Sequence, residues 1–191
     1  GLSYKSQVHL PFSGYANFQN PDEFSQAVPQ GKADIDLTLP SQWVVGARWS
    51  PTPDVDIAID FEIAQWDSIH KVYVDLEPDP ESGPDDTPPW QSTFTPRFGA
   101  TWRAFPILTA RTGLFYDPSP VPDAMVDVTS PDSSRMGFTC GASLNLTEFL
   151  SLDVGYQYLL FMGSQTPNTQ AEKISFEGSA HLIGSSVGIH L

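Results

Sequence analysis

The feature that most constrains this chain is a period of two in hydrophobicity, sustained over longer stretches than soluble strands usually reach. From residue 135 to residue 146 every even position is apolar, while the odd positions are mostly small or polar. Residues 150–162 repeat the alternation after a three-residue connection. Strict alternation puts the apolar side chains on one face of an extended strand, so both stretches are predicted to be antiparallel strands with one apolar face.

The same pattern predicts six further strands. They cover residues 2–12, 35–49, 55–63, 94–104, 108–116 and 174–191. In the last one, Ala180 and Leu182 have one parity while Val187 and Ile189 have the other, so a β-bulge near Gly184 is expected. The predicted fold class is all-β, an antiparallel up-and-down β-barrel segment of about eight strands that spans residues 1–191 as one domain.

The connections between these strands alternate between short and long. Three short ones fall at residues 50–54, 105–107 and 147–149, and four long ones at residues 18–32, 77–90, 118–134 and 163–173. Transmembrane barrels show this asymmetry, with tight turns on the periplasmic rim and long loops outside. An even number of strands would then put both ends of the chain on the periplasmic side.

Charge and composition exclude several classes of protein. The formal net charge of −14 argues against binding to nucleic acid. No run of about 18 apolar residues exists, which excludes a transmembrane helix, whereas a transmembrane strand needs only about 9–11 residues. Much of the acidity lies in residues 75–86 and 117–132, which are rich in Pro, Ser and Asp and are predicted to be exposed loops.

The polar face of the strands favours a membrane barrel over a soluble sandwich. It carries Gly, Ser and Thr together with charges of both signs, which suits a wet barrel interior in which opposite charges pair. Trp49 and Trp102 lie at strand ends beside short turns, where an interfacial girdle is expected. Ordinary core aromatics of a soluble sandwich are the alternative interpretation of these two residues.

Five stretches together resemble the FadL and TodX family of outer-membrane transporters. They are GLSYKSQV at residues 1–8, ADIDLTLPSQWVVGARWSP at 33–51, RTGLFYDPSPVPD at 111–123, SPDSSRMGFTCGAS at 130–143 and LSLDVGYQYLL at 150–160. The resemblance implies a fourteen-stranded barrel with an N-terminal hatch, of which this chain would be the C-terminal portion, without the hatch and the first strands.

The resemblance also implies a function. It is passive transport of long-chain fatty acids or aromatic hydrocarbons across the cell outer membrane of a Gram-negative bacterium, without enzymatic activity and without a cofactor. The expected partners are the hydrophobic ligand, membrane lipid and lipopolysaccharide, and other chains that complete the barrel, but no nucleic acid. Two alternatives remain open: a structural or adhesive barrel with a blocked lumen, and a soluble all-β binding module.

A fatty acid needs an apolar path for its tail and a cationic group for its carboxylate. The candidates for the carboxylate are inward-facing arginines, namely Arg97, Arg103, Arg111 and Arg135, with Lys5 and Arg48 behind them. The candidates for the tail are the apolar residues that interrupt the polar face, namely Phe115, Leu159 and Phe161. The competing interpretation is that the arginines pair with lumenal carboxylates for stability, namely Asp56, Asp60, Glu62 and Asp153.

No catalytic or metal-binding pattern is predicted. Asp56, Asp60 and Glu62 share one face, but pairing with lumenal arginines is favoured over acid–base chemistry or cation binding. The acidic loop lacks the spacing of an EF-hand, so a solvated loop is favoured over a Ca²⁺ site. The single Cys140 and the four scattered histidines give no metal-ligand spacing.

Overall fold

The computed structural model describes residues 1–16, 31–68, 73–76, 90–122, 126, 132–165 and 175–189. Strands make up almost all of its regular structure, and they form two sheets. The larger sheet has eight strands: β1 (Leu2–Lys5), β4 (Gln42–Thr52), β5 (Val55–Ala64), β7 (Thr93–Phe105), β8 (Leu108–Asp117), β9 (Arg135–Asn145), β10 (Leu150–Gln165) and β11 (Ser175–Ile189). The smaller sheet has three strands: β2 (Val8–Ala16), β3 (Gly31–Leu39) and β6 (Tyr73–Leu76).

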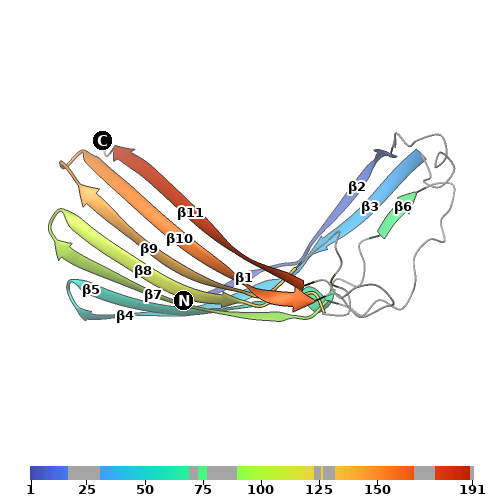
Figure 1. Ribbon diagram of the computed structural model, residues 1–191, viewed down its shortest axis with the longest axis horizontal. Helices are drawn as coiled ribbons and strands as arrows, with labels where there is room; N and C mark the ends of the chain where they lie inside the picture. Colours follow the sequence, from blue (N-terminus) through green and yellow to red (C-terminus); the bar gives the residue numbers. More distant parts are fainter. Residues whose placement is uncertain are drawn as a thin grey trace.

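The larger sheet is a meander in which each strand pairs antiparallel with the one that follows it in the sheet. Figure 1 shows it as a curved wall, with β1 and β11 at its two edges. The register puts residues of like character opposite one another, as where Leu152 of β10 lies between Leu144 of β9 and Val187 of β11. The predicted all-β, up-and-down architecture is therefore confirmed, as an open eight-stranded sheet within the described residues.

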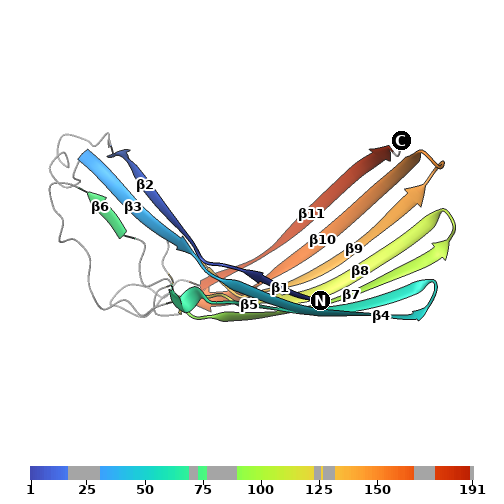
Figure 2. The ribbon, with the colours of Figure 1, turned by 180° about the vertical axis from the view of Figure 1, so that it is seen from behind.

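The predictions for residues 2–12 and 35–49 were wrong in one respect, because each of these strands bends and is shared between the two sheets. The bends fall between β1 and β2 and between β3 and β4, so that β2, β3 and β6 form an arm set at an angle to the wall (Figures 1 and 2). Pro40 has no backbone N–H for a strand ladder. Beside it, buried Ser41 donates its hydroxyl to the Gln65 side-chain oxygen at 2.5 Å and accepts the Gln65 backbone N–H at 3.0 Å. These two bonds hold the bend against the end of β5.

The acidic segment was also predicted wrongly at its start. Residues 75 and 76 were expected in an exposed loop, but Tyr73–Leu76 forms β6 and pairs with β3. Tyr and Val favour strands, and the free edge of β3 supplies a partner for their backbone groups. The remaining acidic residues of this segment, 77–86, lie outside the described residues.

The bulge expected near Gly184 is absent. The ladder between β10 and β11 runs without a shift from the Leu150–Ile189 pair to the Phe161–Gly178 pair, and the irregularity follows Phe161 instead. The change of parity in β11 has a different cause. Its odd positions face outward, whereas Ala180 and Leu182 face the same side as Leu159 and Gln157 of β10. An unbroken ladder pairs the backbone groups of β11 that face β10, so the strand keeps its register and places two apolar side chains on the polar face.

The short turns gather at one end of the wall, on the left of Figure 1, and the longer connections at the other. The end of β11 lies at the short-turn rim, because Ile189 is opposite Leu150. The first strand, β1, runs away from that rim, from Leu2 opposite Val45 to Lys5 opposite Gln42, and pairs with β4 partway along its length.

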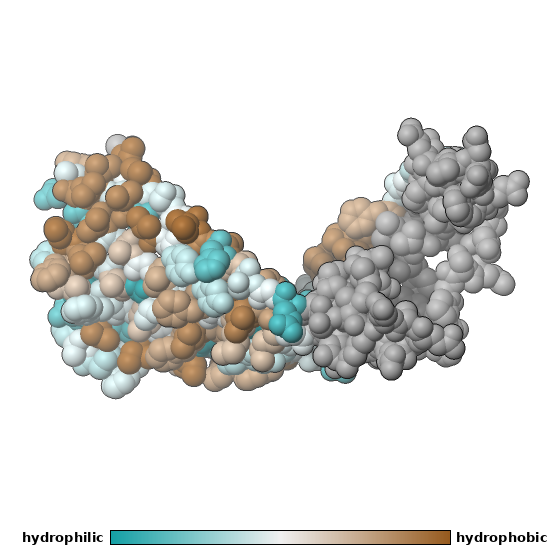
Figure 3. Space-filling model, in the orientation of Figure 1, coloured by the Kyte–Doolittle hydropathy of each residue, from teal (hydrophilic) through white to brown (hydrophobic). Residues whose placement is uncertain are grey.

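The burial pattern of the wall is the reverse of that in a soluble protein. Among the described residues, the only buried hydrophobic residues are Ala64 and Val126, while Asp56 and Ser143 are buried at 6% and 8% exposure. The outward face carries many exposed large apolar side chains, and apolar residues colour much of the short-turn end of the wall in Figure 3. A sandwich would bury these side chains, whereas a barrel wall presents them to lipid.

Trp49 and Trp102 are 65% and 56% exposed beside the short turns, where a girdle is expected, and they are not core aromatics. The described residues contain one helix, the single turn Trp66–Ser68, so nothing helical in them has the length to cross a bilayer.

Candidate ligand-binding face of the sheet

The face opposite the exposed apolar side chains carries all the candidate residues. Odd positions of β7 to β10 pair with one another across it, as in the row Arg97, Phe115, Gly137 and Leu159. We call this the lumen face, since it is the polar side of the wall. The candidates fall into three groups that differ in what surrounds them.

Arg97 lies between two carboxylates of β5. Its guanidinium is 2.7 Å from a Glu62 oxygen and 3.3 Å from an Asp60 oxygen. The two acids are two residues apart on one face of β5, and the register puts Asp60 directly opposite Arg97. Arg97 is therefore neutralised by its neighbours, as the competing interpretation expected.

Arg103 and Arg48 share a single carboxylate near the short-turn rim. Asp56 accepts from Arg48 at 2.5 Å and from Arg103 at 2.6 Å, and its other oxygen accepts from the Ser50 hydroxyl at 2.6 Å. Arg103 also donates to the carbonyl oxygen of Pro53 in the turn between β4 and β5. This cluster joins three neighbouring strands and anchors the turn, which accounts for a buried aspartate on the lumen face.

Arg135 pairs with Asp117 at the far end of the wall. Its guanidinium contacts one carboxylate oxygen of Asp117 through two nitrogens, at 2.6 and 2.7 Å. Asp117 was assigned to a loop by its neighbours in sequence, and only the register, which sets it opposite Arg135, identifies it as a partner. Lys5 lies on the edge strand β1 opposite Gln42, away from the other candidates.

Arg111 differs from the other arginines. Its guanidinium donates to the Ser143 hydroxyl at 2.5 Å, and that hydroxyl in turn donates to the carboxylate of Asp153. Among the described residues it is the one arginine that makes no direct ion pair with a carboxylate. Ser143 is buried, so a fixed hydroxyl separates the cation from the nearest anion.

The apolar candidates come together in one patch. Phe115 lies opposite Gly137, Gly137 opposite Leu159 and Leu159 opposite Ala180, while Phe161 follows Leu159 on the same face of β10. A Cβ atom on Gly137 would lie 2.1 Å from the Phe115 ring, so the ring covers this glycine and extends toward Leu159. We call Phe115, Leu159, Phe161 and Ala180 the apolar lumen patch.

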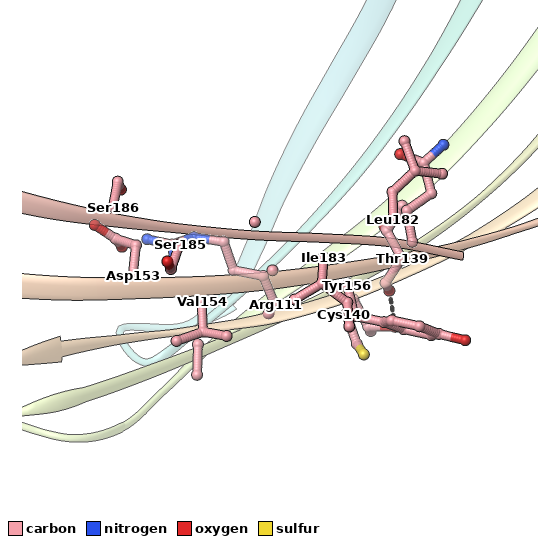
Figure 4. Close-up of a pocket in the computed structure, with 16 residues that line it drawn as sticks. Arg111, Thr139, Cys140, Asp153, Val154, Tyr156, Leu182, Ile183, Ser185 and Ser186 are labelled. Carbon is pink, nitrogen blue, oxygen red and sulfur yellow. Dashed lines mark hydrogen bonds between the residues drawn. The ribbon is translucent and has the colours of Figure 1, made fainter. Parts of the chain in front are cut away.

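A concavity of about 700 Å³ opens over β9, β10 and β11 beside Arg111. Its floor is a row of glycines in register, Gly141, Gly155 and Gly184, and a Cβ atom on either of the last two would meet nothing within 4 Å. Arg111 and Asp153 lie on one side of the strands in Figure 4, while Val154 and Cys140 point to the other. This concavity could not be predicted from the sequence, because a row of glycines on adjacent strands becomes visible only once the register is known.

The described residues contain no cluster of metal-ligating side chains.

Comparison with known proteins agrees with this architecture. The family model described as outer membrane protein transport protein (OMPP1/FadL/TodX) matches residues 1–190. A long-chain fatty acid transport protein of Escherichia coli O6:H1 is 25% identical over 205 residues, which cover 97% of this chain and 45% of that protein.

Two solved structures share the fold. The crystal structure of a Pseudomonas aeruginosa FadL homologue aligns with a TM-score of 0.78 at 16% identity, covering 97% of this chain and 46% of the homologue. The Ralstonia pickettii toluene transporter TbuX aligns with a TM-score of 0.56 at 14% identity, covering 98% and 43%. The chain thus spans about half the length of the relatives it matches.

Proposed function

The chain belongs to the OMPP1/FadL/TodX family of outer membrane transport proteins, and from this premise we propose that it forms part of the wall of a channel for hydrophobic compounds. It is an outer-membrane β-barrel segment, in keeping with the fold and with its relatives. The transported compounds are long-chain fatty acids or aromatic hydrocarbons, the two classes named for the similar transporters. Transport is passive diffusion down a gradient.

The apolar lumen patch is the observation that carries this proposal. A water-filled pore for polar solutes is lined by polar side chains, but here three large apolar side chains, Phe115, Leu159 and Phe161, lie close together on the lumen face. They lie beside the ion-paired Arg97 and Arg135. Apolar bulk on the wet side of a barrel is costly unless it contacts an apolar ligand or another apolar segment. A hydrophobic substrate supplies that contact.

Closure of the barrel forms a second part of the proposal. Strands β1 and β11 each pair on one side only within the described residues, and an open edge is not tolerated in a bilayer. We propose that further strands, from the same polypeptide or from another chain, pair with both edges and complete the lumen. The outer surface of the closed barrel would contact membrane lipid and lipopolysaccharide.

Uptake of radiolabelled oleate into liposomes that contain the full chain tests the proposal. Leu159→Ser places a hydroxyl in the apolar lumen patch, and Leu160→Ser makes the same change on the opposite face of β10, where the side chain is 44% exposed. We expect Leu159→Ser to slow uptake several-fold and Leu160→Ser to leave it close to the unaltered rate, after correction for the amount of folded barrel. Uptake no faster than in protein-free liposomes would refute transport and favour a structural barrel with a blocked lumen.

A further inference from the structure

We propose that the concavity beside Arg111 binds the carboxylate of an amphipathic substrate, with Arg111 as the residue that distinguishes a fatty acid from a neutral hydrocarbon. This inference rests on the proposed function and names the substrate class within it. It stands on three observations: the bonding of Arg111, the open volume next to it, and its position relative to the apolar lumen patch.

The bonding of Arg111 leaves donors available to a ligand. A guanidinium has five N–H donors, and the described contacts of Arg111 use one nitrogen, toward the Ser143 hydroxyl. The other lumen arginines already contact carboxylates of the protein, so a ligand would have to displace a charged partner there. At Arg111 a ligand carboxylate displaces at most a neutral hydroxyl.

Ser143 keeps the Arg111 guanidinium from pairing directly with the Asp153 carboxylate. It accepts from Arg111 and donates to Asp153, so its hydroxyl is used in both directions and stands between the two charges. Arg111 lies opposite Gly141, and Asp153 lies opposite Ser143, one row nearer the short-turn rim. Without the hydroxyl, the two charges could pair directly and close the site.

The glycine row gives the ligand room. Gly155 and Gly184 carry no side chain above the strands, and nothing lies within 4 Å of where a Cβ atom would be. The neighbouring rows are filled by Gln157 with Leu182 on one side and by Asp153 with Ser186 on the other. The carboxylate head group of a ligand therefore has room to bind beside Arg111, against the backbone of the glycine row (Figure 4).

The apolar lumen patch lies where the tail would be. Arg111 and Phe115 are four residues apart on the same face of β8, which is about 14 Å at about 3.4 Å per residue. The acyl chain of a long-chain fatty acid spans this separation, so one molecule can contact Arg111 with its carboxylate and the patch with its methylenes. Leu182 lies between the two regions and continues the apolar contact.

Binding of two ligands of equal chain length separates charge recognition from tail contact. The affinities of oleate and of oleyl alcohol are measured for the full chain in detergent micelles. Arg111→Met keeps an unbranched stem of similar length to the aliphatic part of arginine but removes the guanidinium and its charge-assisted hydrogen bonds. We therefore expect oleate to bind about tenfold more weakly and the alcohol to be unaffected. Lys32→Met, an exposed position on β3 in the arm, makes the same change in net charge and is expected to alter neither affinity.

Two further variants test the roles of the neighbours. Asp153→Asn removes the competing negative charge and should strengthen oleate binding alone. Ser143→Ala should weaken oleate binding, because Arg111 and Asp153 can then pair directly. The heat-modifiable mobility of the folded barrel in gels confirms that each variant has folded before its affinity is compared.

The outcomes distinguish this inference from the proposed function. The assignment of Arg111 is refuted if Arg111→Met binds oleate as tightly as the unaltered chain, or if its affinities for oleate and for oleyl alcohol fall equally. Transport of hydrophobic compounds stands in both cases. If the unaltered chain binds neither ligand, the proposed function itself is refuted, and the carboxylate site with it.

Discussion

The substitution Val154→Arg tests how deep in the membrane the outward face of β10 lies. Val154 is 47% exposed and lies four residues from Leu150 at the short-turn rim. Four residues span about 14 Å of strand, or about 10 Å along the membrane normal for a strand tilted by about 40°. This places Val154 close to the middle of an apolar band about 25 Å tall, where an arginine costs about 2–4 kcal/mol.

Two matched variants provide stabilities with which that of Val154→Arg is compared. Ile189→Arg makes the same kind of change at the rim, opposite Leu150, where the cost falls to about 0–1 kcal/mol. Gln157→Arg adds the charge on the lumen face of the same strand as Val154, beside the open row of Gly155 and Gly184. We therefore expect Val154→Arg to be less stable than Ile189→Arg by about 2–3 kcal/mol, roughly 30- to 150-fold in the equilibrium constant.

The assay is equilibrium unfolding of the full chain in phosphatidylcholine vesicles, followed by tryptophan fluorescence against denaturant concentration. Equal penalties at Val154 and Ile189 would refute the assigned depth. A larger penalty for Gln157→Arg than for Val154→Arg would refute the assignment of the two faces.

Three further experiments test individual contacts. Arg97→Met should lower the free energy of unfolding by only about 1 kcal/mol, because all three members of its ion-pair cluster are partly exposed, and replacing its two carboxylate partners by amides as well should recover part of the loss in the same denaturant assay. Gly137→Ala forces the Phe115 ring to move and should cost about 1–3 kcal/mol, whereas Gly155→Ala should change stability by less than about 0.5 kcal/mol; equal effects would contradict the packing described. Ser41→Ala removes a hydrogen bond at the bend and should make the arm cleave faster under limited proteolysis, and an unchanged cleavage rate would show that the bend does not depend on it.

Alternation in the sequence was enough to predict the faces of the wall. Because side chains on a strand point to opposite sides in turn, a pattern such as that of residues 150–162 assigns each residue to a face without knowledge of its neighbours. All seven candidate ligand residues consequently lie on the lumen face, as expected. Whether they bind a ligand stays a prediction.

Features that depend on pairing between strands could not be read from the chain. The bend beside Pro40 leaves only one polar residue, Ser41, at an apolar position before the pattern resumes. The bend itself is defined by hydrogen bonds to Gln65, far along the sequence. Arg135 bonds to a carboxylate and Arg111 to a hydroxyl, and this difference depends on which residues the register places near each one. The position of Leu182 on the lumen face follows in the same way from an unbroken ladder with β10.

Accessibility of spin labels along β10 tests the central claim most directly, namely that the apolar face contacts lipid and the polar face lines an aqueous lumen. Labels at Leu152, Val154 and Leu160 of the membrane-embedded chain should be relaxed mainly by oxygen dissolved in lipid. Labels at Asp153, Gly155 and Gln157 should be relaxed mainly by a water-soluble nickel chelate, so that the two signals alternate from one residue to the next. Labels at Leu152 and Val154 that are shielded from oxygen, with a dry environment at Gly155 and Gln157, would contradict the account.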